Sequence, residues 1–177
     1  MKITAFAAST SKQSINRQLV KHVLKSFADA DINLLDLNDF DMPVFSVDRE
    51  KEGFPEEAQN FLDQFRDCDL IIVGMAEHNG NCTAAFKNVL DWSSRISNAV
   101  FNHKPMFLTG TSPGGNAAKM SMEYAKTRFP RHSGTVLETF NLPSFNENFN
   151  EEKGILDEGL RDELSLKIKT VKETLTA

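Results

Sequence analysis

The sequence has few of the residues that build metal centres and disulfide frameworks. Its 177 residues include two cysteines, Cys68 and Cys82, which do not form a C-x-x-C pair. They give no indication of a disulfide framework. The four histidines are scattered, without the i, i+4 spacing or the neighbouring cysteines of a zinc site. We therefore predict no metal site.

Long apolar runs and an excess of positive charge are also absent. No apolar stretch could span a bilayer, and the N-terminus lacks the pattern of a signal peptide. We therefore expect a cytoplasmic protein with no membrane partner. There are 20 Lys and Arg residues against 25 Asp and Glu, a net charge of −5, and no basic run is present. Nucleic acid is not expected as a partner.

Three catalytic or nucleotide-binding patterns are missing as well. The nine glycines form neither a Walker loop nor the three-glycine dinucleotide fingerprint. No serine lies in a G-x-S-x-G elbow, so hydrolysis is not supported. The length suits one domain, residues 1–177, which can bury roughly 70% of its unfolded surface without a disulfide or a metal.

What the sequence does contain is a regular alternation of short apolar runs and amphipathic segments. The expected strands are 3–7, 32–37, 70–74, 105–109 and 134–137. The expected helices are 15–27, 56–66, 84–97, 115–128 and 156–175. This alternation predicts an α/β fold, a flavodoxin-like doubly wound sheet of five parallel strands in the order 2-1-3-4-5, with helices on both faces. Ligands of such sheets bind at the carboxyl ends of the strands, near the switch between strands 1 and 3.

The loop after the first expected strand is rich in hydroxyl groups. It contains Ser9, Ser11 and Ser14, and Ser14 is the best N-cap candidate for the helix that follows. Backbone N–H groups and hydroxyls would converge there on the positive end of the helix dipole, which favours an anion. The alternative is that these serines only cap the helix and satisfy the turn.

Two more polar loops are expected at the same edge of the sheet. Residues 75–83 contain Asn79-Gly80, which suits a turn with positive φ. This segment can equally be an ordinary surface turn, followed by a helix in which Trp92 is in the core and Lys87 pairs with Asp91. Residues 108–115 end in a proline followed by two glycines, where the backbone can approach a ligand. One phosphate site and two backbone-lined walls describe a site for a mononucleotide.

Three motifs make the chain resemble the NADPH-dependent FMN reductases, a flavodoxin-like family that includes azo-dye, quinone and chromate reductases. The first, G-S-x-R-x-x-S-x-N, matches at Ser9, Ser14 and Asn16. The second, P-E-Y-N-x-x-x-x-x-x-L-K-N-x-x-D-W, matches at Glu77, Asn79, Lys87, Asn88, Asp91 and Trp92. The third, S-P-G-x-x-G, matches at Ser112, Pro113 and Gly114.

The resemblance implies an FMN-dependent enzyme that takes electrons from NADPH or NADH and passes them to free flavin, a quinone or an azo compound. It implies that the FMN phosphate is held by Ser9, Ser11, Ser14, Ile15 and Asn16. It further implies that the isoalloxazine ring is flanked by Glu77, His78, Asn79 and Gly80 on one side and by Ser112 and Gly114 on the other. The flavin would perform the chemistry, so no specific catalytic residue is named.

Assembly and activity have alternatives. Relatives are often homodimers or homotetramers, and helix 84–97, with Trp92 and Arg95, is the expected interface, although a core role for Trp92 is an equal alternative. A flavin-binding electron carrier or sensor would have the same fold, and so would a module that no longer binds flavin.

The chain departs from the family pattern in two places. Ser11 stands where the family often has arginine, which removes one phosphate-binding cation, and Lys12 is adjacent. Ala76 and His78 stand where the family has proline and tyrosine. These departures leave the substrate and the strength of phosphate binding open.

Overall fold

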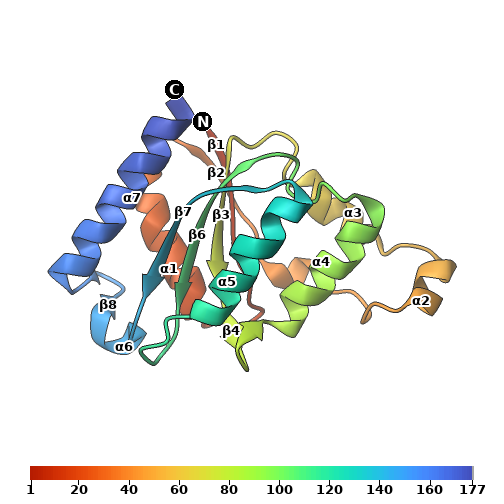
Figure 1. Ribbon diagram of the computed structural model, residues 1–177, viewed down its shortest axis with the longest axis horizontal. Helices are drawn as coiled ribbons and strands as arrows, with labels where there is room; N and C mark the ends of the chain where they lie inside the picture. Colours follow the sequence, from red (N-terminus) through yellow and green to blue (C-terminus); the bar gives the residue numbers. More distant parts are fainter. Residues whose placement is uncertain (177) are drawn as a thin grey trace.

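A parallel sheet of five strands runs through the middle of the computed structural model, which describes residues 1–176 (Figure 1). Its order is β2-β1-β3-β6-β7. All four neighbouring pairs are parallel. The strands are β1 (Lys2–Ala7), β2 (Asp31–Leu34), β3 (Leu70–Met75), β6 (Pro105–Thr111) and β7 (Thr135–Leu142).

The strand numbers are not consecutive because two short hairpins lie outside the sheet. One consists of β4 (Glu77–His78) and β5 (Asn81–Cys82), and the other of β8 (Phe149–Asn150) and β9 (Gly154–Ile155). Neither hairpin was predicted from the sequence. The prediction of a parallel α/β sheet is confirmed, and the order 2-1-3-4-5 reads 2-1-3-6-7 once the hairpin strands are numbered.

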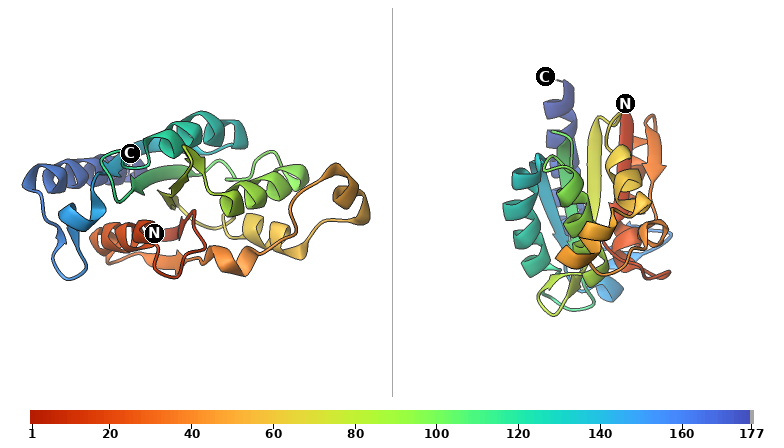
Figure 2. Two further views of the ribbon diagram at one scale, coloured as in Figure 1. Left: turned by 90° about the horizontal axis from the view of Figure 1, so that it is seen from below. Right: turned by 90° about the vertical axis from the view of Figure 1, so that its right-hand side faces the viewer.

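Helices cover both faces of the sheet. One face packs against α1 (Ile15–Leu24) and α7 (Glu158–Thr176). The other packs against α3 (Glu56–Asp63), α4 (Ala84–Ile96) and α5 (Lys119–Arg128). The N-terminus and the C-terminal end of α7 lie at the end of the molecule opposite the β4–β5 hairpin (Figures 1 and 2).

Strand β3 shows why apolar runs became central strands. Its six residues are all buried, and alternate side chains enter different cores: Ile71 and Val73 face α3, α4 and α5, whereas Ile72 faces α1 and α7. Gly74 is the penultimate residue of the strand, and a Cβ there would lie 2.9 Å from the carbonyl oxygen of Asn16 and 2.7 Å from Val20. The absence of a side chain there lets the first turn of α1 approach the sheet.

Some boundaries differ from the sequence prediction. The helix expected over 115–128 begins at Lys119, because Ala117 and Ala118 have φ values of 52° and 58° and cannot continue a right-handed helix. The strand expected over 134–137 extends to Leu142. The segment expected to be irregular contains two short helices, a 3-10 helix (Leu37–Phe40) and α2 (Val47–Glu52).

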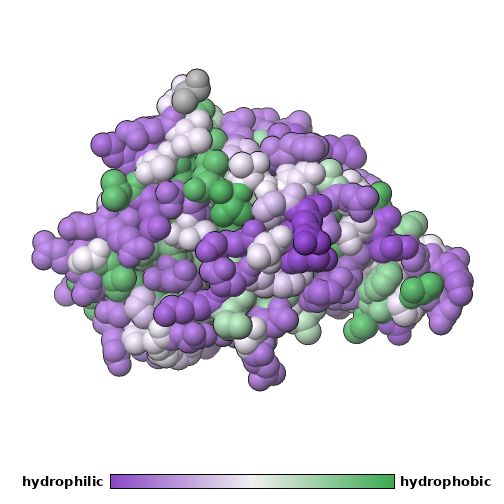
Figure 3. Space-filling model, viewed as in Figure 1, coloured by the Kyte–Doolittle hydropathy of each residue, from purple (hydrophilic) through white to green (hydrophobic). Residues whose placement is uncertain are grey.

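The segment that includes α2 projects from the body of the molecule, at the right of Figure 1. It carries Val44, Val47 and Phe54, which are exposed, and Figure 3 shows hydrophobic atoms on this projection. The rest of the face shown there is mainly hydrophilic. Within residues 1–176, no helix has both the length and the apolar composition needed to cross a bilayer.

Candidate functional site

Three loops meet at the carboxyl-terminal edge of the sheet, where β1, β3 and β6 end. They comprise residues 8–14, 76–83 and 112–118, and we call them the first, second and third loop. The left view of Figure 2 looks onto this edge, which lies at the bottom of Figure 1. Because neighbouring parallel strands bring their following loops together, the three segments predicted from sequence do share one edge.

The serines of the first loop are arranged as acceptors for the backbone. The Ser9 hydroxyl accepts from the N–H of Ser11, and the Ser11 hydroxyl accepts from the N–H of Gln13. The buried Ser14 hydroxyl accepts from the N–H of Arg17 at 3.2 Å, which makes Ser14 the N-cap of α1 as predicted. Each hydroxyl that accepts in this way keeps its own O–H free to donate.

Helix α1 adds backbone donors to the same place. Its first residues, Ile15 and Asn16, have no intrahelical acceptor for their N–H groups. No acidic residue lies in this first turn, so nothing there opposes the positive end of the helix dipole. Capping by the serines and anion binding are therefore compatible, since capping uses their lone pairs and leaves donors available.

The side chain of Asn16 has a different position from the one the resemblance implies. It is buried, its Nδ2 donates to the carbonyl oxygen of Thr111, and its Oδ1 accepts from the N–H of Thr111. This pair of hydrogen bonds fixes the first turn of α1 to the end of β6. The Asn16 side chain thus joins the helix that follows the first loop to the strand that precedes the third loop. Its backbone N–H is the group left to donate at the N-terminus of α1.

The second loop forms the tight hairpin β4–β5. Asn79 and Gly80 have φ values of 52° and 73°, which confirms the expected turn with positive φ. His78, Asn79 and Gly80 are all exposed on this hairpin. Their side chains and backbone are accessible to a flat ligand at the edge of the sheet.

Glu77, at the start of the hairpin, reaches across to α5. One carboxylate oxygen accepts from the N–H groups of Met120 and Ser121, at 2.8 and 3.0 Å. The other accepts from the Asn116 side chain at 2.7 Å. Helix α5 has no cap from its own N-cap residue, Ala118. Glu77 supplies that cap from another loop and thereby joins the second loop to the third.

Thr83 completes the connections among the loops. Its hydroxyl donates to the carbonyl oxygen of Ala8 at 2.8 Å, and it also accepts from the N–H of Phe86 as the N-cap of α4. The second loop is therefore joined to the first. Thr83 and Glu77 thus connect the second loop to the first and to the third, and Asn16 connects the two elements that adjoin the first and third loops.

The third loop is held by Ser112. Its hydroxyl donates to the carbonyl oxygen of Gly114 and accepts from the N–H of Ala117, both at 2.9 Å. The loop is anchored from outside by Asn141, whose side chain donates to the carbonyl oxygen of Ala117. Gly114 is exposed, and a Cβ on it would meet no atom within 4 Å. Gly114 therefore presents a surface without a side chain, but its carbonyl oxygen is engaged by Ser112 and by the N–H of Ser144. The Ser112 hydroxyl is likewise engaged within its loop.

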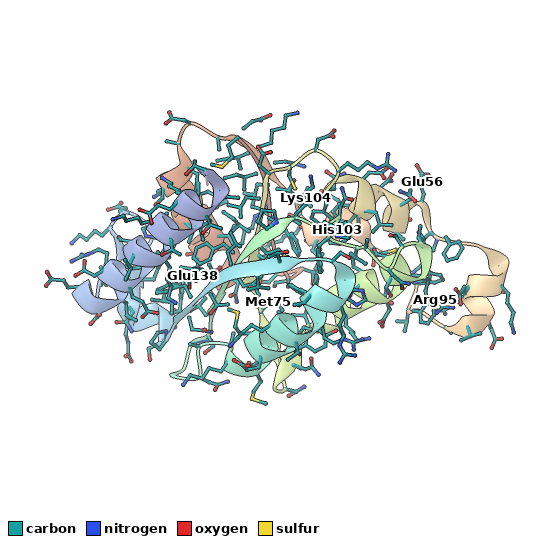
Figure 4. The ribbon with its side chains drawn as sticks, turned by 45° about the horizontal axis from the view of Figure 1, so that its top comes forward. Glu56, Met75, Arg95, His103, Lys104 and Glu138 are labelled. Atoms are coloured by element: carbon teal, nitrogen blue, oxygen red, sulfur yellow. The ribbon has the colours of Figure 1, made fainter. Side chains whose placement is uncertain are left out.

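The rest of the second motif lies behind the site, on α4. Trp92 is in the core, with 1% of its surface exposed, and Lys87 pairs with Asp91. The Asn88 side chain accepts from the N–H of Phe45 and donates to the carbonyl oxygens of Met42 and Pro43, and the Trp92 indole also donates to Pro43. These residues anchor the segment before α2. Arg95, labelled in Figure 4, holds α2 itself through Glu50.

Burial changes the acidity of two groups behind the hairpin. It raises the pKa of the Cys82 thiol, so this cysteine stays protonated. It also raises the pKa of Tyr124, on the neighbouring helix α5, to about 12. Neither side chain is prepared for proton transfer at neutral pH. Among residues 1–176, no three His, Cys, Asp or Glu side chains are grouped as metal ligands.

A hollow of about 770 Å³ lies at the edge of the sheet opposite the three loops. His103 and Lys104 line it, and both are labelled in Figure 4. Lys172, also in its wall, is already bonded to the carbonyl oxygen of Ser26 and lies over the ring of Phe27. The volume of this hollow would suit a ligand, but the convergent hydrogen-bond donors lie at the three-loop edge. We therefore place the candidate site at the three-loop edge.

The donor set of the first loop fits a phosphate monoester. Three hydroxyl donors and the N–H groups of Ile15 and Asn16 come from one turn, at the positive end of a helix. The two other loops add exposed backbone at Gly80 and Gly114, which suits a flat ring system. FMN has both parts, a terminal phosphate and a planar ring.

Sequence reasoning missed three residues that build the site. Thr83 is readable as an N-cap before α4, but its bond to Ala8 crosses 75 residues of sequence. Thr111 acts through its backbone, which no sequence pattern marks. Asn88 was recognised only as part of a motif, without a structural role.

Known proteins have sequences related to this chain. The family profile of NADPH-dependent FMN reductases matches residues 1–147. A 2-hydroxy-1,4-benzoquinone reductase of Burkholderia is 31% identical over 127 residues, covering 71% of this chain and 68% of that protein. An NAD(P)H-dependent FMN reductase of Pseudomonas aeruginosa is 32% identical over 73 residues, which are 41% of this chain and 40% of that enzyme.

The fold is also found among solved structures. FerB, a flavoenzyme NAD(P)H:(acceptor) oxidoreductase from Paracoccus denitrificans, superposes with a TM-score of 0.73 and 22% identity, covering 97% of both chains. This likeness concerns the fold, whereas the profile match, over most of the sequence, concerns ancestry. The chain belongs to the NADPH-dependent FMN reductase family.

Proposed function

We propose that the protein is an FMN-dependent NAD(P)H oxidoreductase that delivers electrons to a small acceptor, such as free flavin, a quinone or an azo compound. The observation that carries the proposal is the first loop, where three serine hydroxyls and the first turn of α1 converge at the edge shared with two exposed, polar loops. The family membership and the names of the relatives support FMN and a quinone acceptor.

The phosphate site is assigned to the first loop. Ser9, Ser11 and Ser14 donate their hydroxyl hydrogens to the phosphate oxygens, and the N–H groups of Ile15 and Asn16 donate along the axis of α1. The buried position of Ser14 orders its hydroxyl before the ligand arrives. Since binding then orders few groups, less free energy is lost on association.

The two walls of the ring site are assigned to the second and third loops. His78, Asn79 and Gly80 form one wall, with Glu77 beneath them, and Ser112 and Gly114 form the other. When bound, FMN supplies the redox chemistry, hydride acceptance from the nicotinamide and electron delivery to the acceptor. The protein supplies position and exposure, because the hairpin leaves one side of the edge accessible. No side chain is assigned a proton transfer.

Three wider properties belong to the same proposal. Residues 1–177 form a single flavodoxin-like domain, because the helices on both faces pack against the same five-stranded sheet. The protein acts in the cytoplasm, where its nicotinamide co-substrate is available. It assembles as a homodimer or homotetramer through α4 and the exposed apolar residues of the neighbouring projection. Equilibrium sedimentation tests the last point.

A flavin-binding carrier or sensor is the competing function, and anaerobic reduction separates the two. The FMN-loaded protein is mixed with NADPH, and separately with NADH, without oxygen. Bleaching of the visible flavin spectrum at the rate of turnover supports the enzyme. An unchanged spectrum with both nucleotides contradicts it. A protein that stays colourless after incubation with excess FMN would instead be a module without flavin.

The phosphate assignment is tested by Ser14→Asp. Aspartate still caps α1, but its carboxylate repels a phosphate in the same turn, so we expect FMN binding to be abolished. The matched control is Ser46→Asp, the same change at the N-cap of α2, where the Ser46 hydroxyl accepts from Arg49. Titration of FMN fluorescence should show native affinity for the control. Native affinity for Ser14→Asp would remove the phosphate from this turn.

A further inference from the structure

We propose that Glu77 is a positioning residue that fixes the two walls of the ring site against each other, without itself contacting the ring. The inference rests on the proposed function, because the walls are defined by a bound flavin. It departs from the role that the resemblance implies for this residue.

The carboxylate of Glu77 is already occupied. It accepts three hydrogen bonds, two from the backbone N–H groups of Met120 and Ser121 and one from the Asn116 side chain, at 2.7 to 3.0 Å. An ionised carboxylate has about four acceptor sites and no donor. Three of its sites are used within the protein, and it has no hydrogen to offer to the carbonyl oxygens of a flavin ring.

The helix that Glu77 caps depends on this contact. Helix α5 begins after Ala117 and Ala118, two non-glycine residues with positive φ, a conformation that is unfavourable for a residue with a side chain. The N-cap, Ala118, has no side-chain acceptor to offer to the first turn. The negative charge of Glu77 lies instead at the positive end of the helix and satisfies two of its N–H groups.

The same contact sets the position of both walls. Glu77 is the first residue of the β4–β5 hairpin, one position before His78. Asn116, Met120 and Ser121 flank the turn that follows Ser112 and Gly114. A single side chain therefore connects the wall that carries His78, Asn79 and Gly80 to the wall that carries Gly114. Loss of the contact removes this link between the walls, although no atom that touches the ligand is removed.

The test compares Glu77→Gln with Glu123→Gln. Both remove one negative charge near α5, but Glu123 is exposed on the outer surface of this helix, where its carboxylate pairs with Lys126. In the protein without FMN, hydrogen exchange of the Met120 and Ser121 amides should be about tenfold faster in Glu77→Gln and native in Glu123→Gln. This readout does not depend on the flavin, so it distinguishes failure of the contact from failure of the proposed function.

The second readout uses FMN. Glu77→Gln should bind FMN about tenfold more weakly, and at saturation the visible spectrum and fluorescence of the bound flavin should differ from those of the native complex, because the ring is held less firmly. A purely structural role would lower the unfolding midpoint and leave the spectrum of the saturated complex native. That result would overturn the proposal.

Two other results would also overturn it. Native amide exchange combined with weak FMN binding would show that Glu77 contacts the flavin directly. Fast exchange combined with native affinity and a native spectrum would show that the contact does not serve the site. Faster exchange, weaker binding and an altered spectrum together support the positioning role.

Discussion

At the scale of single residues, two polar side chains that the motifs associate with ligand binding are engaged within the protein, where they join elements at the edge of the candidate site. Asn16 and Glu77 both belong to the motifs that identify the family, and both have their side chains engaged with backbone 43 to 95 residues away in sequence. A motif read along the chain gives the residue type at a position. It does not give the partner, which only the fold brings near.

The serines of the first loop were more predictable. Ser14 caps α1 as the sequence indicates, since N-capping depends on a local pattern of backbone N–H groups. Their role toward a phosphate is a proposal that the donor geometry supports. The missing arginine of the family pattern, at Ser11, provides a further test at this scale.

We expect Ser11→Arg to strengthen FMN binding. Ser11 is exposed, and a guanidinium there would reach an anion in the first loop, which is worth about 1 kcal/mol at such a site, or about fivefold in affinity. The measurement is the FMN dissociation constant at low and high salt. The gain should shrink at high salt, because exposed charges are screened.

Ser11→Ala is the control for the hydrogen bond that the substitution removes, from the N–H of Gln13 to the Ser11 hydroxyl. It should bind FMN slightly more weakly than the native protein. If the arginine and alanine variants have the same affinity at low salt, no phosphate lies within reach of position 11.

At the scale of elements, the sequence predicted those helices and strands whose structure depends mainly on their own side chains. The run Leu70–Met75 was predicted as a central strand because it is apolar throughout, and it is buried on both faces. The start of α5 was predicted four residues early, since Gly115 and Asn116 do not show that Ala117 and Ala118 adopt positive φ. That conformation is imposed by Ser112, Asn141 and Glu77 from outside the helix.

The segment before α2 is a second case of an element held from outside. It is polar and irregular in sequence, yet three hydrogen bonds from Asn88 fix it to α4. The structure therefore gives a role to the most specific motif of the family pattern. Its Asn and Trp hold a neighbouring loop, and this contribution is to the fold of the edge.

We expect Asn88→Ala to destabilise the protein by about 1–3 kcal/mol, because it leaves the N–H of Phe45 and the carbonyl oxygen of Met42 without the Asn88 partner, whereas the carbonyl oxygen of Pro43 keeps its bond from the Trp92 indole. Urea unfolding measures the free energy of unfolding. Limited proteolysis should show faster cleavage within residues 41–46.

The control for this change is Asn60→Ala, in α3. Asn60 is exposed, and alanine is the better helix former, so stability should be unchanged or slightly higher. Equal stability of the Asn88 and Asn60 variants would show that water replaces the Asn88 contacts at no cost.

At the scale of the whole molecule, polar groups buried away from the site make stability depend on pH. His22, on α1, packs edge-on against Phe149 at 5.5 Å, and its Nδ1 has no hydrogen-bond partner among the described residues. Gly154, with φ of 76°, lies against the ring where any Cβ would collide. Burial, and secondarily the charge of Lys25, lower the pKa of His22 from its usual 6.5.

The lowered pKa determines the sign of the effect. The folded state prefers the neutral ring, whereas the unfolded chain takes up a proton below about pH 6.5. The unfolded state then binds more protons than the folded state. The contribution of His22 to the free energy of unfolding is therefore constant above this pH and falls as the pH is lowered toward the folded-state pKa. Burial also lowers the pKa of His132, which acts in the same direction from the other side of the sheet.

We therefore expect the native protein to lose stability between pH 7 and pH 5, and His22→Leu to lose less over the same range. Leucine fills much of the ring volume and removes both the unpaired Nδ1 and the titration. Urea unfolding at a series of pH values gives the two slopes. His103→Asn, which removes an exposed histidine at a position with positive φ that asparagine tolerates, is the matched control for the loss of a histidine. If the slope of His22→Leu matches the native one, His22 titrates alike in the folded and unfolded states, and the β8–β9 hairpin does not exclude the charged ring.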